Sequence, residues 1–282
     1  MSVIVGRLRE IGRYPAIATA IAVLSGAGVF ALATTVFAYH STNHDEAVYL
    51  MQAAMLLEGQ LELHVTEATD AFRPWFFIED GNRLYPKYTP VPAAMYAVSM
   101  ALFGEPRVTL AAIAAGNTAL VYLLGRTVFD RPVGIVAATL FAASPLAIVT
   151  TSVFLPYAPT TFLNLLFAVA YLRNLRTKSL ATACVAGIAI GLAFFARPYT
   201  AVLFAAPFVV HALYRVTTSI RDGGLLPPAD PVRQHGATAL FGLLFVGVTL
   251  AYNLQMTGSP LLFPYEAFAP LDGPGFGRRQ IL

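Results

Sequence analysis

Apolar residues in this chain occur in long runs separated by short polar segments. Seven runs approach or reach the roughly 20 residues of a membrane-spanning helix: residues 15–39, 108–125, 132–150, 158–172, 180–196, 199–214 and 236–254. A shorter run, 91–103, begins beside Pro90 and Pro92. It is short for a span, so we interpret it as a juxtamembrane or re-entrant helix. The pattern predicts an all-α, polytopic transmembrane helix bundle with residues 1–282 as a single transmembrane domain.

The composition agrees with a membrane protein. Hydrophobic residues make up 57% of the 282 residues and charged residues only 12%, whereas a soluble domain carries about 25% charged residues. The net charge is only +3, so we read the pI near 9.0 as a topology signal and expect no nucleic-acid partner. The one cysteine, Cys184, lies inside an apolar run, which excludes an intrachain disulfide and a cysteine-based metal site.

The basic residues predict the orientation in the membrane. Cytoplasmic segments are enriched in Lys and Arg, and such residues occur before the first run and in three later turns: Arg7, Arg9, Arg13, Arg126, Arg131, Arg173, Arg176, Lys178, Arg215, Arg221 and Arg233. The loop 40–89 instead has eight acids against three basic residues. We therefore expect a multi-pass plasma-membrane protein with a cytoplasmic N-terminus, a retained first span, and external loops at 40–89 and 255–282. If 91–103 crosses the membrane, this orientation is reversed.

Adjacent carboxylates, Asp45 and Glu46, directly follow the first span. Their position favours acid/base chemistry at the membrane surface. A purely structural role for these carboxylates is the alternative. Asn43-x-x-Glu46 fits a capping box, and acids in a first helical turn interact favourably with the helix dipole.

Other polar and aromatic residues also allow two interpretations. Lys87 could bind a phosphate or extend to lipid headgroups, and Arg197 could bind a phosphate or anchor the end of a span. The aromatic cluster 72–77 is typical of the lipid–water interface, with a sugar-stacking platform as the alternative. Gly187 and Gly191 form a small-xxx-small pattern, which predicts close helix packing.

These elements together resemble the N-terminal part of a GT-C-type membrane glycosyltransferase, a class that includes aminoarabinose transferases and protein mannosyltransferases. The matching features follow in order along nearly the whole chain: Asp45-Glu46, Tyr49-Leu50, Leu56–Gly59, Lys87–Pro90, Leu102–Gly104, Leu123–Phe129, Ala143–Pro145 and Ala196–Pro198. Members of the class are typically longer, so we expect the chain to lack their C-terminal part.

The resemblance implies a function and a set of roles. Enzymes of this class move a sugar from a polyprenyl-phosphate donor to an acceptor hydroxyl. Asp45 corresponds to the catalytic base, with Glu46 beside it as a second catalytic residue or a metal ligand. Four basic residues correspond to candidates for binding the donor phosphate: Lys87, Arg197, Arg278 and Arg279. The expected partners are this donor, membrane lipids and an acceptor of unknown type.

One departure from the family pattern concerns a metal ion. Many relatives place a second Asp, or a His, in the loop after the third span, but the corresponding segment 151–159 has no acidic residue. A divalent metal ion is therefore an open question, with Asp45, Glu46 and His44 as the candidate ligands. A lipid or solute transporter and a non-catalytic membrane assembly subunit are the alternative functions. The mostly uninterrupted spans and the acidic first loop favour the enzyme.

Overall fold

The protein is described by a computed structural model that covers residues 12–39, 41, 43–64, 73–223 and 230–271. The helices are α2 (Arg13–Thr35), α3 (Asp45–Leu57), α5 (Val91–Phe103), α6 (Arg107–Val128), α7 (Arg131–Ala142), α8 (Pro145–Thr151), α9 (Tyr157–Thr177), α10 (Leu180–Ala196), α11 (Pro198–Gly223), α12 (Asp230–Thr257) and α13 (Pro264–Phe268). The strands are β1 (Leu63–His64), β2 (Phe77–Asp80) and β3 (Arg83–Pro86).

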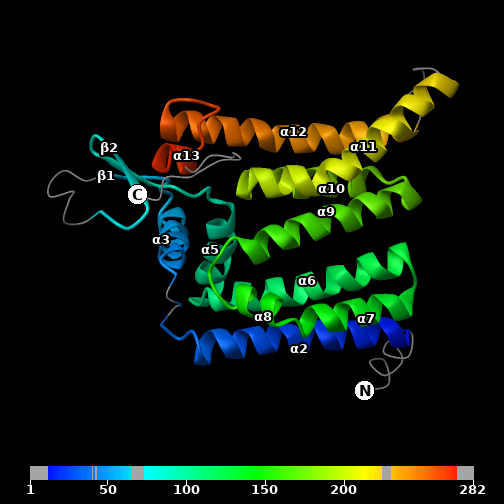
Figure 1. Ribbon diagram of the computed structural model, residues 1–282, viewed down its shortest axis with the longest axis horizontal. Coiled ribbons are helices and arrows are strands. Elements are labelled where there is room, and N and C mark those ends of the chain that lie inside the picture. The colour runs from blue at the N-terminus through cyan, green and yellow to red at the C-terminus, as the bar shows by residue number, and fades with distance from the viewer. Residues whose placement is uncertain (1–11, 40, 42, 65–72, 224–229, 272–282) are drawn as a thin grey trace.

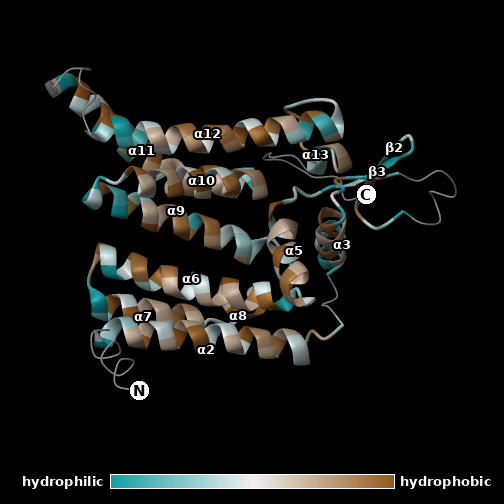
Figure 2. Ribbon diagram, turned by 180° about the vertical axis from the view of Figure 1, so that it is seen from behind, coloured by the Kyte–Doolittle hydropathy of each residue, from teal (hydrophilic) through white to brown (hydrophobic). Residues whose placement is uncertain are grey.

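The long helices lie side by side and form a bundle (Figure 1). Apolar residues predominate along them, whereas polar residues concentrate toward their ends and in the loops (Figure 2). Within the described residues, α2, α6, α11 and α12 are each long and apolar enough to cross a membrane, and the bent pair α7–α8 would make a fifth span. The predicted fold class, an all-α polytopic helix bundle, is confirmed.

A helix covers each predicted span, but the run 132–150 is not one straight helix. It divides into α7 and α8, which are bent by 61° at the break between them. Ser144 begins the new helix, because its Oγ accepts a hydrogen bond from the Ala147 backbone N–H at 3.4 Å. Pro145 follows at the first helical position, where its missing N–H costs nothing. Ser-Pro thus ends one helix and starts another.

Helices α10 and α12 pack closely through two glycines. A Cβ atom on Gly187 would lie 2.5 Å from the Thr238 carbonyl oxygen, and one on Gly191 would lie 2.6 Å from the Phe245 Cβ. Real Cβ atoms do not approach other heavy atoms so closely, so each glycine permits backbone contact that any side chain would prevent. The structure confirms the close packing that the small-xxx-small pattern predicts.

The first loop forms a structured layer across one end of the bundle. Helices α3 and α5 run across the ends of the long helices rather than alongside them (Figures 1 and 2). With only 13 residues, α5 is too short to span, and its position fits the predicted juxtamembrane helix. Next to α3 lies a three-stranded antiparallel sheet of order β1-β3-β2. The hydrophobic pattern of the sequence did not predict this sheet.

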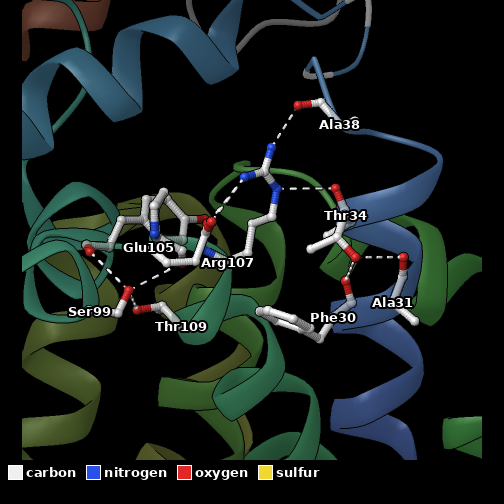
Figure 3. A network of polar contacts seen from close by, with 11 residues as sticks. Phe30, Ala31, Thr34, Ala38, Ser99, Glu105, Arg107 and Thr109 are labelled. Atoms are coloured by element: carbon white, nitrogen blue, oxygen red, sulfur yellow. Dashed lines mark hydrogen bonds and ion pairs between the residues drawn. The ribbon is translucent and has the colours of Figure 1, made fainter. Parts of the chain in front are cut away.

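Arg107 holds this layer to the bundle (Figure 3). Its guanidinium donates hydrogen bonds to two carbonyl oxygens, from Nε to Ala33 near the end of α2 at 3.1 Å and from Nη2 to Ala38 just beyond α2 at 2.8 Å. The same group bonds Glu105 Oε1 at 3.1 Å, and the Thr109 hydroxyl donates to the Met95 carbonyl of α5 at 2.9 Å. The end of α2, the α5–α6 turn and the start of α6 are thereby fixed together.

The two ends of the bundle differ in charge. The start of α2, the α6–α7 and α9–α10 turns, the end of α11 and the start of α12 lie at one end, and α3, α5, the sheet and α13 lie at the other (Figure 1). The predicted cytoplasmic basic residues that the structure describes, such as Arg131 and Arg176, therefore share the end opposite α3.

Candidate active site

A cavity of about 450 Å³ opens at the end of the bundle that carries α3 and α13. Five segments form its wall: the first turns of α3, the segment leading to α5, the start of α9, the α10–α11 junction and residues 263–266. Asp45, Lys87 and Arg197 all line this cavity, although they are far apart in the sequence. The structure thus brings together three of the predicted site residues.

Asp45 is the first residue of α3 and is held by the loop before it. Its backbone N–H donates to Asn43 Oδ1 at 3.0 Å. The Tyr88 side chain interacts with its carboxylate. Burial, followed by this interaction with Asp45, raises the pKa of Tyr88 well above its ordinary value. Tyr88 therefore remains a neutral hydroxyl, able to donate to the carboxylate at physiological pH.

A second tyrosine supports this pair from the core side. Tyr49 stacks on Tyr88 with ring centroids 4.8 Å apart, and it is almost completely buried. Burial raises the pKa of Tyr49 well above its ordinary value, and the neighbouring Tyr88 adds to this effect. The stacked rings lie beside Asp45 in the wall of the cavity.

Glu46 does not line the cavity, although it adjoins Asp45 in sequence. Its side chain is 1% exposed, and its carboxylate accepts hydrogen bonds from the Ser41 backbone N–H at 2.7 Å, the Ser41 hydroxyl and the Phe154 backbone N–H at 2.8 Å. These contacts tie the start of the first loop to the α8–α9 connection. The capping box is not formed, because Glu46 bonds Ser41 rather than the backbone N–H of Asn43.

Aromatic rings surround the Lys87 ammonium group. Lys87 Nζ lies 3.5 Å from the centroid of the Phe76 ring, and three further rings lie within 5.5 Å of it, those of Tyr88, Tyr265 and Phe268. Phe76 reaches this place through a left-handed backbone conformation, with φ at +61°, and its carbonyl accepts the Lys87 backbone N–H at 3.0 Å. A left-handed conformation is costly for a bulky residue, so the surrounding contacts must hold it.

Arg197 occupies the junction where α10 ends and α11 begins. Its backbone is extended, with Pro198 directly after it, and its guanidinium lies 4.7 Å from the centroid of the Tyr157 ring. The Thr89 hydroxyl donates to the Ala196 carbonyl at 3.1 Å, which joins the Lys87 segment to this junction. This hydrogen bond therefore holds the segment of Lys87 and the segment of Arg197 next to each other.

Sequence reasoning missed a second carboxylate in the cavity. Glu266, on the short helix α13, lines the wall and accepts a hydrogen bond from the Tyr199 hydroxyl at 3.0 Å. The cavity is thus lined by two carboxylates and two cations. A lone Glu in a polar loop gives no sequence signal; only the fold shows that α13 closes over the site.

The candidate metal ligands do not come together. No group of three or more His, Cys, Asp or Glu side chains able to hold a metal ion occurs in the described part of the chain. Asp45 faces the cavity and both Glu46 oxygens accept hydrogen bonds from the protein, while His44 stacks on Trp75 with ring centroids 4.6 Å apart. These three residues do not fit a shared ligand set. Arg278 and Arg279 lie outside the described residues.

One protein family matches part of the chain. Residues 87–223, just under half of the chain, match the dolichyl-phosphate-mannose-protein mannosyltransferase family. The match supports a mannosyltransferase-type domain of the GT-C class in this segment, and with it a membrane glycosyltransferase. No individual curated protein matches the chain. The matched segment contains Lys87 and Arg197, whereas Asp45 and α13 lie outside it.

Proposed function

We propose that the protein transfers a sugar from a polyprenyl-phosphate donor to an acceptor hydroxyl in the cavity that Asp45, Lys87 and Arg197 share. The observation that carries this proposal is their common cavity. A carboxylate and two cations from separate segments face one space, in a protein whose central segment matches a glycosyltransferase family.

Each of these residues has a chemical role in the proposed transfer. Asp45 accepts the proton of the acceptor hydroxyl as the hydroxyl oxygen forms a bond to the anomeric carbon. The bond between the anomeric carbon and the phosphate oxygen breaks, and its electron pair leaves with the polyprenyl phosphate. Lys87 and Arg197 stabilise the charge of this leaving group, as preorganised cations do at the oxygens of a departing phosphate.

The surroundings of these residues suit the proposed roles. Lys87 is 7% exposed, so its charge acts in an environment that screens it less than water does. Tyr88 interacts with the Asp45 carboxylate, and Tyr49 stacks on Tyr88 from the core side. Aromatic rings beside both cations limit where a phosphate can bind.

We further propose that this end of the bundle faces away from the cytoplasm. The described basic turns lie at the opposite end (Figure 1), which by the positive-inside rule is cytoplasmic. The active site would then act on donors presented at the outer membrane face.

The test is sugar transfer in membranes that contain the full chain. Polyprenyl-phosphate donors with different radiolabelled sugars are supplied to the wild type and to Asp45→Asn. We expect label transfer by the wild type from at least one donor and its loss, by more than about a hundredfold, in Asp45→Asn. Equal transfer by both proteins would remove Asp45 from the mechanism.

A further inference from the structure

A second cavity lies beside the first and has no role in the mechanism described so far. Its volume is about 530 Å³, and residues 73–79 together with Ala267 and Phe268 form its wall. It therefore lies between the segment that runs into β2 and the last residues of α13.

The most exposed aromatic group of this second cavity is Trp75. It is 67% exposed and lines the cavity. One face of the indole is covered by His44, with ring centroids 4.6 Å apart and an interplanar angle of 25°, and Phe76 packs edge to face with centroids 6.1 Å apart. His44 thus covers one face of the ring, while the side chain as a whole stays largely exposed. An exposed indole with a stacked partner behind it is a suitable platform for a flat apolar ligand surface.

Charged groups line the same cavity. Arg73 Nη1 lies 3.6 Å from Glu79 Oε2, and their side chains are 52% and 33% exposed. These groups can donate and accept hydrogen bonds at the edge of a ligand that stacks on Trp75. An acyl chain would gain nothing from this pair, whereas the hydroxyl edge of a sugar would.

The two cavities share a wall. Phe76 and Phe268 meet edge to face at 5.7 Å, and both rings contact the Lys87 ammonium group. Along α13, Tyr265 and Glu266 line the first cavity, while Ala267 and Phe268 line the second. On the other side, His44 under Trp75 directly precedes Asp45 in the chain. A ligand in the second cavity is therefore separated from the first cavity by the Phe76–Phe268 wall.

We propose that the second cavity is a carbohydrate subsite, in which a pyranose ring of the acceptor stacks on Trp75. This inference rests on the proposed function and specifies its acceptor as a neutral glycan. A pyranose has an apolar C–H face and an edge of hydroxyls. These match the indole face and the Arg73–Glu79 pair. A sugar held there places a neighbouring hydroxyl at the side of the wall where Asp45 lies.

The chain provides its own reporter for the test. Trp75 is the only tryptophan in the sequence, so tryptophan fluorescence reports on this cavity alone. The full-length protein, purified in detergent, is titrated with neutral di- and trisaccharides of glucose, mannose, galactose and N-acetylglucosamine. We expect a saturable change in emission with at least one of them, and the same change when the protein is already saturated with polyprenyl phosphate.

Variants separate stacking from general surface effects. Saturation-transfer NMR measures binding of the same saccharide without requiring the indole. Trp75→Ala should weaken binding by about tenfold, the loss expected for one well-packed aromatic contact, and Trp75→Phe should retain part of it. Phe103→Ala is the matched control, because Phe103 is 65% exposed but lines neither cavity, and it should bind as the wild type does.

Three results would overturn the inference. In the first, no saccharide binds although polyprenyl phosphate does. In the second, a Ser/Thr-rich peptide, but no saccharide, gives the saturable change. In the third, brominated lipids in nanodiscs quench Trp75, which would make it a membrane-interface residue. Failure of polyprenyl phosphate itself to bind would instead contradict the proposed function and this inference together.

Discussion

Removing the Glu46 carboxylate should unfold the first loop rather than disable a catalytic group. Glu46 is 1% exposed and accepts the backbone N–H groups of Ser41 and Phe154. In Glu46→Ala both groups lose their partner inside the protein. A buried unsatisfied N–H costs about 1–3 kcal/mol, and the loss of a desolvated charge offsets part of the total. We therefore expect a loss of about 2–4 kcal/mol in the free energy of unfolding.

The assay is thermal unfolding of the purified protein in detergent, with polyprenyl-phosphate binding measured on the same samples. Glu46→Ala should lower the midpoint by roughly 5–15 °C, and Glu46→Gln should lower it less, because one carbonyl oxygen remains as an acceptor. Glu58→Ala is the control, since Glu58 is an exposed residue just after α3, and its change should stay within about 0.5 kcal/mol. If Glu46→Ala melts like the wild type yet loses sugar transfer, Glu46 is catalytic and the structural reasoning is refuted.

Three further predictions concern packing, pH and topology. Gly191→Val should separate α10 from α12 and cost about 1–3 kcal/mol in unfolding free energy, which detergent unfolding measures; wild-type stability would contradict the packing. Burial raises the pKa of Tyr49. Above a pH of about 10, Tyr49 therefore ionises in the unfolded protein but stays neutral in the folded protein, and the free energy of unfolding should fall. A pH series of melts should show this fall reduced in Tyr49→Phe, and an unchanged slope would refute it. In a Cys184→Ser background, a membrane-impermeant maleimide should label Gln60→Cys but not Lys178→Cys in intact cells; the opposite pattern would reverse the orientation.

The helices could be predicted from the sequence because long apolar runs determine them directly. The bend at Ser144 could not, since Ser-Pro occurs both inside kinked spans and at helix starts, and only the 61° angle between α7 and α8 distinguishes the two. The β2–β3 hairpin had a usable signal that was missed. Gly81 and Asn82 separate two short runs of apolar and aromatic residues, a common two-residue hairpin turn, and Gly81 has φ at +65°.

The candidate site was partly predictable. Asp45, Lys87 and Arg197 were identified through their order and their resemblance to a family, and the fold places them in one cavity. The roles of adjacent acids were not predictable, because Asp45 and Glu46 point in different directions from the start of α3. Glu266 was missed because its importance comes entirely from the position of α13, which depends on long-range packing that no local pattern encodes.

The most direct test of the account measures binding and transfer separately. Polyprenyl-phosphate binding and single-turnover sugar transfer are determined for the wild type, Asp45→Asn, Lys87→Met and Arg197→Met. The account predicts that Asp45→Asn binds the lipid phosphate within about twofold of the wild type but transfers no sugar. Each cation variant should bind at least about tenfold more weakly. Undiminished lipid-phosphate binding by both cation variants, or transfer by Asp45→Asn at the wild-type rate, would contradict the proposed active site.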